Sequence, residues 1–308
     1  MPVYRVVSGY ALQMPMTVEN PPRTALVFGA SGQIGTELVT RLVRDGWHVH
    51  AVSRQQRSSP AGVHWLQGSL GEPPALPAVV DVVFSCGPLD AFSQWYAHAA
   101  LQCPRVIAFS STSVMVKQDS QDPFERDLAA RLAAGEQAVL TRALTVQAAA
   151  TLLRPTLVWG AGMDRSLSRI AALAGRWGLF VLPNSARGKR QPVHVSDLAS
   201  AAMAVIDCPT SHGQVYALGG GQVLSYQQMV RQVLAALPGQ PRLWCVPGAF
   251  FSLLVRVAAA SGKMAGFGPA MQARMQQDLV FDIGPAQRDF GYAPRGFAPN
   301  PAELGMDQ

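Results

Sequence analysis

The stretch TALVFGASGQIGTELVTRLVR, residues 24–44, decides the fold. Apolar residues at 24–28 predict a strand, three glycines predict a tight turn, and apolar residues at helical spacing predict a helix from Ile34 to Arg44. Gly29 permits the turn, Gly32 lets a phosphate approach the backbone, and Gly35 lets the helix pack close to the sheet. This order of strand, turn and helix predicts a site for the phosphates of a dinucleotide at the start of the helix. The residues expected to contact it are Gly29, Ser31, Gly32, Gln33, Ile34 and Gly35.

Further strands are predicted along the chain, and helical patterns separate several of them. They are expected at 47–52, 63–67, 79–86, 105–111, around Leu153 and at 214–220, with a helix over 194–206. Strands that alternate with helices predict an α/β fold, a Rossmann-type doubly wound parallel sheet. The Pro- and Gly-rich residues 68–77 predict that one crossover lacks a full helix.

This pattern also predicts how the chain is divided. Residues 1–23 are expected to be an extension without an assigned function, and 24–165 a dinucleotide-binding domain to which 192–222 return. Residues 166–191 and 223–308 are expected to form a smaller, mainly helical substrate lobe.

Composition excludes several classes of protein. The 308 residues are 49% hydrophobic and 14% charged, which is typical of a globular chain. No run of basic residues indicates nucleic-acid binding, although 25 basic residues face 19 acidic ones. The four cysteines show neither metal-ligand nor redox spacing, so we expect reduced thiols and no metal site.

The first residues do not resemble a secretion signal, so a cytoplasmic protein is expected. The most apolar stretch, 250–260, contains Arg256 and is too short to span a bilayer. It is interpreted as a core helix, and docking to a membrane surface is the alternative.

The end of the second predicted strand indicates which dinucleotide is preferred. NAD-selective sites place a carboxylate there, but none occurs from residue 48 to 58. Ser53, Arg54 and Arg57 stand there instead and could hold a 2′-phosphate. NADP is therefore expected rather than NAD, unless the two arginines are simply solvated surface charges.

Several motifs together carry a family resemblance. They are FSSTSV at 109–114, LRPTLVWGAG at 153–162, RQPVHVSDLASA at 190–201 and QRDFGYAPRGF at 287–297. With the glycine turn they resemble the extended short-chain dehydrogenase/reductase superfamily, in particular the NAD(P)-dependent epimerase/dehydratases that act on nucleotide sugars.

The resemblance implies roles for individual residues. Ser111 matches the catalytic serine or threonine, and Thr112 and Ser113 follow it into the substrate pocket. Arg190 matches an arginine that holds the substrate pyrophosphate, and Arg274 is a weaker candidate for a second contact. On the cofactor side the corresponding residues are Ser69 at the adenine, Ser85, Cys86 and Gly87 against the dinucleotide, and Arg154 and Pro155 beside the nicotinamide.

One departure from the family concerns catalysis. Members carry a Tyr and a Lys four residues apart on the helix after the fifth strand, and with Glu136 as anchor these positions hold Leu128 and Leu132. Loss of both groups predicts that the usual proton transfer is absent. The polar residues considered as substitutes are Tyr96, Asp122, Glu125, Arg126 and Arg131.

Two main functions follow. The first is hydride transfer between NADP and a nucleotide sugar, for epimerisation or reduction. The alternative is a catalytically silent NADP-binding sensor or scaffold. A reductase of other small molecules and a membrane-docked assembly factor are two lesser alternatives. The resemblance also implies a homodimer through the helices beside the fifth strand.

Overall fold

The computed structural model describes residues 22–164, 166–260 and 269–306. Its centre is a seven-stranded sheet with the order β3-β2-β1-β4-β5-β6-β11, in which every pair of neighbours is parallel. The strands are β1 (Thr24–Phe28), β2 (His48–Ser53), β3 (Val63–Gln67), β4 (Val82–Ser85), β5 (Arg105–Phe109), β6 (Ala149–Pro155) and β11 (Val215–Leu218). The predicted doubly wound sheet is confirmed.

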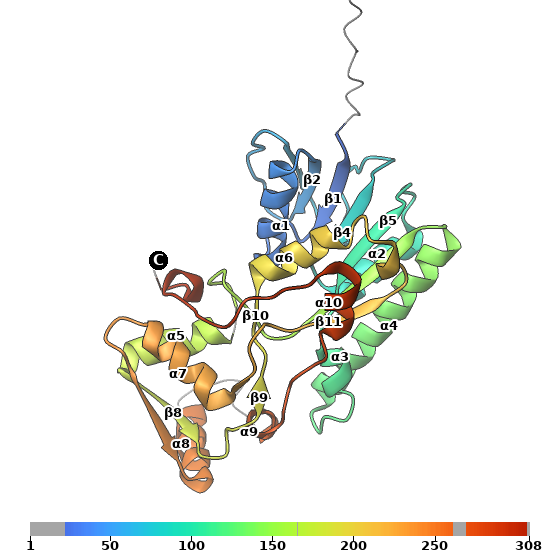
Figure 1. Cartoon of the computed structure of the whole chain (residues 1–308). Coiled ribbons are helices and arrows are strands. Elements are labelled where there is room, and N and C mark those ends of the chain that lie inside the picture. Colours follow the sequence, from blue (N-terminus) through green and yellow to red (C-terminus); the bar gives the residue numbers. More distant parts are fainter. Residues whose placement is uncertain (1–21, 165, 261–268, 307–308) are drawn as a thin grey trace, which may run out of the picture.

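Helices cover both faces of this sheet (Figure 1). On one face lie α1 (Gln33–Arg44) and α6 (Val195–Ala204), and on the other lie α2 (Leu89–His98) and α4 (Pro123–Thr145). Alternate residues of β1 enter the two cores, with Ala25 and Val27 on the α1 side and Leu26 and Phe28 on the α2 side. This two-sided burial explains why the strands are apolar runs without polar alternation.

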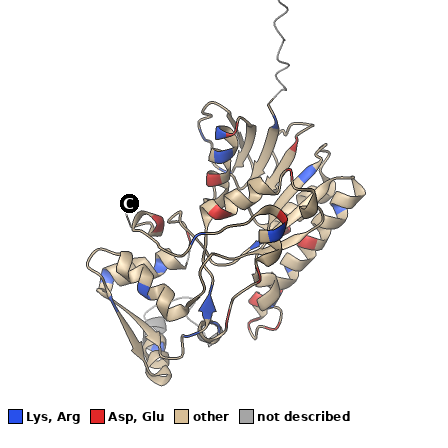
Figure 2. Ribbon diagram, viewed as in Figure 1, with Lys and Arg blue, Asp and Glu red and all other residues tan. Residues whose placement is uncertain are grey.

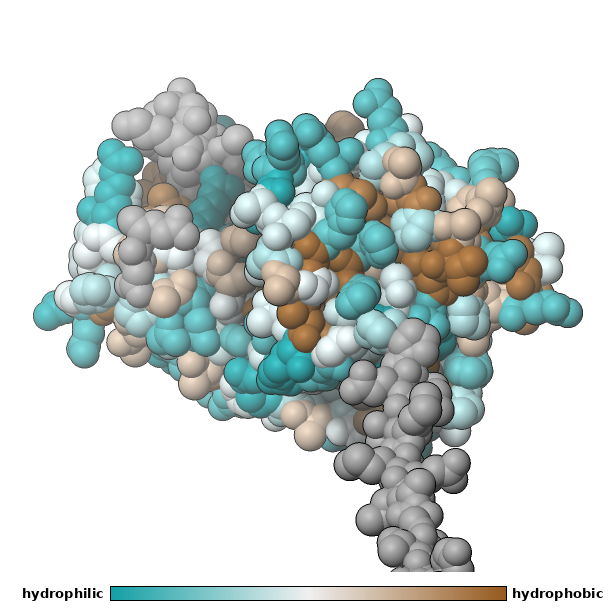
Figure 3. Space-filling model, turned by 90° about the horizontal axis from the view of Figure 1, so that it is seen from above, coloured by the Kyte–Doolittle hydropathy of each residue, from teal (hydrophilic) through white to brown (hydrophobic). Residues whose placement is uncertain are grey.

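Residues 68–81 between β3 and β4 contain no helix, as the Pro and Gly content predicts. The short α3 (Ser113–Val116) follows β5 and precedes α4. Seen from above, where the strands begin, apolar areas gather on the side of α2 and α4 (Figure 3). Val79, Leu144 and Val146 are among the exposed apolar residues.

A second, smaller lobe lies beyond the carboxyl ends of the strands (Figure 1). Its helices are α5 (Leu167–Trp177), α7 (Tyr226–Ala236), α8 (Gly248–Ala260) and α9 (Pro269–Gln276). The lobe also contains a parallel pair, β8 (Leu179–Pro183) with β13 (Arg242–Val246), which the periodicity did not predict. Two short pairs lead into it: β7 (Val158–Trp159) with β10 (Val193–His194), and β9 (Lys189–Arg190) with β12 (Leu224–Ser225).

The C-terminal part of the chain returns to the central sheet. Helix α10 (Gly284–Phe290) packs against β11 and the short helix η1 (Pro209–Ser211), and Tyr292 donates a 2.9 Å hydrogen bond to the carbonyl of Gly219. This stretch was expected in the lobe, but it packs on the core of the sheet because Ala286 and Tyr292 are buried there. The last described turn, η2 (Ala302–Leu304), then contacts α5 in the lobe.

Candidate functional site

The glycine turn between β1 and α1 has the shape that the sequence predicts. Gly29 has φ +70, and a Cβ on it would lie 2.8 Å from the carbonyl carbon of Cys86. A Cβ on Gly35 would lie 2.1 Å from the carbonyl oxygen of Gly29. Neither position therefore accepts a larger residue without movement of backbone.

The start of α1 is free to bind an anion. Its N-cap residue is Gly32, which supplies no side-chain cap, and its first turn carries no acidic residue. Its first amide groups can therefore point at a phosphate. Two buried polar atoms, Gln33 Oε1 at the start of α1 and Ser85 Oγ at the end of β4, have no hydrogen-bond partner within the described residues. Orphaned polar atoms beside an open turn fit a site for a dinucleotide.

The end of β2 carries Ser53, Arg54 and Arg57. Ser53 is buried and its Oγ accepts a 3.2 Å hydrogen bond from the amide of Gln55. Both arginines are exposed, and the Arg57 guanidinium lies 5.2 Å from the ring centre of Trp65. This placement suits contact with a ribose phosphate.

The remaining residues predicted on the cofactor side differ in their surroundings. Ser69 Oγ accepts a 3.1 Å hydrogen bond from the amide of Glu72, so its acceptor capacity is partly used in a local turn. Cys86 packs against the core, and burial raises the pKa of its thiol to about 12, which leaves it protonated and unreactive. A Cβ on Gly87 would meet nothing within 4 Å, so open space lies beside this residue.

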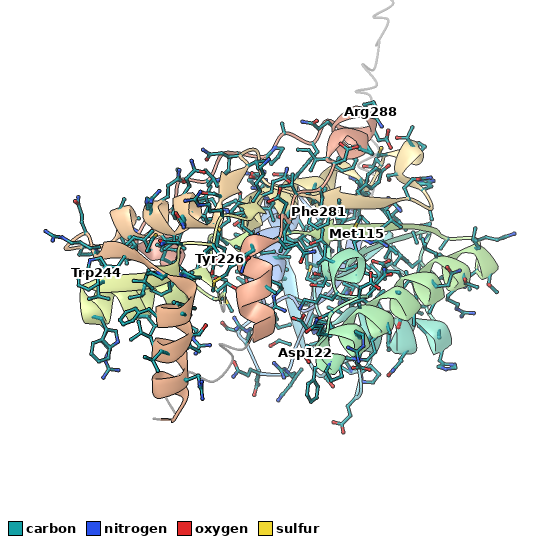
Figure 4. The ribbon with its side chains drawn as sticks, turned by 90° about the horizontal axis from the view of Figure 1, so that it is seen from below. Met115, Asp122, Tyr226, Trp244, Phe281 and Arg288 are labelled. Carbon is teal, nitrogen blue, oxygen red and sulfur yellow. The ribbon has the colours of Figure 1, made fainter. Side chains whose placement is uncertain are left out.

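A cavity of about 470 Å³ lies between the carboxyl ends of β5 and β6 and the second lobe. Among the described residues that line it, four are basic, Lys117, Arg169, Arg190 and Arg274, and none is acidic. Figure 4 places Tyr226 beside α9 on the lobe side and Met115 of α3 on the opposite side. The apolar part of the wall comes from both parts of the chain and consists of Val116, Leu157, Leu167, Ile170, Leu173, Phe180, Met229, Met275, Leu279 and Phe281.

Three predicted hydroxyl residues after β5 line the cavity. Ser111 Oγ accepts a 3.1 Å hydrogen bond from the amide of Ser113, so its own proton is free to be donated to a ligand. Thr112 is buried, and its hydroxyl donates a 3.2 Å hydrogen bond to the carbonyl of Pro155. Ser113 begins α3.

Arg154, predicted beside the nicotinamide, belongs to a hydrogen-bonded group at the end of β6. Its Nε donates a 2.8 Å hydrogen bond to Glu136, and Nη2 contacts the second oxygen of the same carboxylate. Ser110 donates a further hydrogen bond to Glu136. Glu136 is buried, and the positive charge of Arg154 balances the charge of its carboxylate. The same ion pair holds the Arg154 guanidinium in place.

Arg190 lines the cavity but most of its donors are occupied. The guanidinium donates to the carbonyls of Lys189 and Gln277 at 2.7 and 2.8 Å, and to the carbonyl of Arg274. It also lies over the ring of Tyr226, 5.2 Å from its centre. Arg190 thus ties α9 to the strand β9, and few of its donors remain for a substrate.

Lys117 and Arg274 meet at one carboxylate. Glu125 Oε1 lies 3.4 Å from Lys117 Nζ and forms an ion pair with Arg274, while Ser120 donates a 2.7 Å hydrogen bond to Oε2. Burial and the positive charge of Arg274 lower the pKa of Lys117. The cavity thus contains an ammonium group that gives up its proton more readily than an ordinary lysine.

The five residues considered as substitute acids or bases do not line the cavity. Tyr96 is buried in the core beside Phe92, and Arg131 pairs with Asp90 and Asp127. Asp122 caps α4, and Arg126 donates a 2.6 Å hydrogen bond to the carbonyl of Ser120. Glu125 contacts two residues that line the cavity, Lys117 and Arg274. Lys117 and Tyr226 were not predicted as site residues, because only the folded chain places them in the cavity.

Comparison with known proteins gives the family. Residues 25–219 match the model of the NAD dependent epimerase/dehydratase family. The chain belongs to this family. Family membership and the fold confirm the NAD(P)-binding class predicted from the glycine turn, while the choice between NADP and NAD remains a prediction.

Individual relatives differ in their activities. The chain is 25% identical to a 2-alkyl-3-oxoalkanoate reductase of Stenotrophomonas maltophilia, over 88% of this chain and 94% of the relative. It is also 25% identical to the mitochondrial NADH dehydrogenase [ubiquinone] 1 alpha subcomplex subunit 9 of Arabidopsis thaliana, over 72% of this chain and 60% of that protein.

Solved structures share the fold at low identity. One is the UDP-glucuronic acid 4-epimerase of Bacillus cereus in complex with UDP-glucuronic acid and NAD, with a TM-score of 0.62 and 15% identity over 92% of this chain and 98% of that chain. Another is an epimerase of Methanothermobacter thermautotrophicus, with a TM-score of 0.66 and 14% identity over 93% and 90% of the two chains.

Metal-binding clusters and membrane-spanning helices are both absent from the described part of the chain. No group of three or more His, Cys, Asp or Glu residues there could hold a metal ion. Its helices are also too short or too polar to cross a membrane.

Proposed function

We propose that this family member binds NADP over the glycine turn and catalyses hydride transfer to the oxo group of an anionic, largely apolar substrate. The lining of the cavity carries the proposal. Ten apolar and four basic side chains, with no acidic one among the described lining residues, suit an acid with an alkyl body. The 2-alkyl-3-oxoalkanoate reductase among the relatives has a name that describes such a substrate.

The family and the glycine turn supply the cofactor side of the proposal. The amides at the start of α1 would hold the pyrophosphate, and Arg54 and Arg57 would hold the 2′-phosphate. The nicotinamide, when bound, supplies the hydride that the substrate carbon accepts. The residues of this chain then bind the substrate, polarise its oxygen and provide a proton.

Two side chains are proposed for the oxygen of the substrate. The Ser111 proton is free to be donated to it, because the Ser113 amide already occupies an acceptor position on Oγ. Lys117 would deliver the proton that converts the alkoxide to an alcohol, since its pKa is lowered. Tyr226 is the less suitable donor because burial raises its pKa.

A second candidate substrate is a nucleotide sugar. The four basic side chains in the cavity favour it, because a diphosphate is also anionic. The predicted contact of Arg190 with a pyrophosphate is disfavoured, because its guanidinium already donates hydrogen bonds to backbone carbonyls. We therefore rank the oxo acid first.

Turnover assays test the proposal. We expect purified protein to oxidise NADPH with 3-oxo acids. KM should fall by about fourfold for each methylene added to the alkyl chain, since burial of one methylene contributes about 0.8 kcal/mol. UDP-sugars serve as the comparison. Epimerised UDP-sugar without reaction of the oxo acids would select the second candidate, and NADPH binding without turnover would select the silent sensor or scaffold.

A further inference from the structure

The net positive charge of the chain comes from two segments of its smaller lobe. Residues 166–191 and 223–276 contain ten Arg or Lys and no Asp or Glu. The rest of the chain has 15 basic and 19 acidic residues and is therefore net negative. Figure 2 shows the same division, because the lobe around α5, α7 and α8 carries blue segments without red ones.

The substrate cavity does not account for this charge. Of the ten basic residues, three line the cavity: Arg169, Arg190 and Arg274. The other basic residues of these two segments that the structure describes are all exposed, and they are Arg176, Arg187, Lys189, Arg231, Arg242 and Arg256. Such an arrangement serves an anionic partner at the outer surface.

Helix α8 adds an apolar surface to this charge. Phe251 and Val255 are buried, at 5% and 8% exposure. Phe250, Leu253 and Leu254 are three and four residues apart on another face and are 51%, 56% and 39% exposed. A helix that is apolar on its outer face as well needs a partner other than water.

Strand β13 directly precedes α8 and extends this surface. Its Trp244 is 55% exposed, and Figure 4 shows it at the outer end of the lobe, away from Met115 and Asp122. Exposed aromatic and aliphatic residues with arginines before and after them, Arg242 and Arg256, are typical of protein that rests on a lipid surface.

We propose that α8 and β13 dock this protein peripherally on a membrane rich in anionic lipids. Arginine side chains contact the headgroups, and Phe250, Leu253, Leu254 and Trp244 enter the acyl boundary. A second copy of the chain does not suit this face, because two strongly positive lobes repel each other. Nucleic acid does not suit it either, because a phosphate backbone offers nothing to the apolar side chains.

Co-sedimentation of the full-length protein with vesicles tests the proposal. We expect binding to phosphatidylcholine vesicles that contain phosphatidylglycerol, and at least tenfold weaker binding to phosphatidylcholine alone. Raising the salt from about 0.1 M to about 1 M shortens the Debye length from about 10 Å to about 3 Å and should weaken binding to the anionic vesicles.

Two sets of variants locate the surface. F250Q/L253Q/L254Q should lose at least tenfold in vesicle affinity. V79Q/L144Q/V146Q, whose three residues are also exposed but distant in the sequence, should bind like the original chain. R231Q/R242Q/R256Q should lose the preference for anionic lipid. Absence of binding to anionic vesicles, equal loss in the control triple, or a concentration-dependent dimer that the α8 triple abolishes would each overturn the proposal.

Discussion

Lys117 is the residue on which the proposed chemistry most depends. The family resemblance predicts a catalytic Tyr and Lys pair at two positions where this sequence has Leu128 and Leu132. Lys117 reaches the cavity from the end of α3, and Glu125 and Arg274 set its charge environment. Replacement of the proton donor should therefore affect the rate of turnover more than binding.

We predict that K117M lowers kcat by about 100-fold, the lower end of what general acids contribute. The lowered pKa also means that activity should decline with rising pH already below 10.5, the ordinary lysine value, as the ammonium is lost. Steady-state assays across pH test both effects. K189M, which removes an exposed lysine outside the cavity, is the control, and an unchanged kcat in K117M would contradict the assignment.

The two arginines after β2 determine the predicted preference for NADP. In R54A/R57A we expect about tenfold weaker binding of NADPH and unchanged binding of NADH, because each guanidinium contributes a charge-assisted bond to the extra phosphate. Fluorescence titration with both cofactors measures this. R44A, an exposed arginine at the end of α1, is the matched control. Equal weakening for NADPH and NADH would show that the pair does not read the 2′-phosphate.

At the scale of elements, the contact of α1 with the glycine turn shapes the cofactor crevice. We predict that G35A destabilises the protein by about 2 kcal/mol and abolishes NADPH binding, because the added methyl group would lie 2.1 Å from the carbonyl of Gly29. Denaturant unfolding and cofactor titration measure the two effects. G248A should change neither, since no atom of the described residues lies within 4 Å of the corresponding position.

Helix α6 begins at a histidine whose pKa is lowered in the folded protein. His194 is its N-cap, its Nδ1 accepts a 3.1 Å hydrogen bond from the amide of Ser196, and Nε2 lies 3.2 Å from Glu303. Burial and the charge of Arg295 lower the pKa of His194. Because the unfolded chain then binds a proton more readily, the free energy of unfolding should decrease as pH falls through 6.5, the ordinary value.

Denaturant unfolding at several pH values checks this. H194N keeps a capping side chain that does not titrate, so its stability should fall less between pH 7 and 5 than that of the original chain. His50 and His212, whose pKa values burial also lowers, supply the dependence that remains. Identical pH profiles in both proteins would exclude His194 as a contributor.

At the scale of the whole molecule, the two parts of the chain complete the cavity together. The sheet supplies Ser111 and Thr156 at the ends of β5 and β6, and the lobe supplies Ile170, Phe180 and Met229. The chain crosses between the two parts several times, and the C-terminal segment binds α6 through Arg295 and Asp197 at 2.9 Å. Binding in the crevice should therefore stabilise the protein as one unit.

We predict that NADPH at 100 times its dissociation constant raises the free energy of unfolding by about 2.7 kcal/mol in a single cooperative transition. The same concentration of NADH should raise it less. Thermal and denaturant unfolding with each cofactor test this. Two separate transitions, of which NADPH shifts one, would show that the lobe unfolds independently.

The sequence determined the sheet, the glycine turn and the family, because these depend on local periodicity and on turn residues within one segment. It did not reveal the β8–β13 pair, whose strands are separated by more than fifty residues. It also assigned residues 284–292 to the lobe, whereas their apolar side chains are buried against β11.

The chemistry of the cavity was decided by tertiary structure. Arg190 donates to the carbonyls of residues 274 and 277, and Glu125 joins Lys117 to Arg274. Apart from the contact of Glu125 with Lys117, these contacts join segments far apart in the chain. A motif indicates which residue types are present at a spacing. Which donors remain free, and which pKa values shift, depends on the neighbours that folding brings, and these are set by packing of the whole chain.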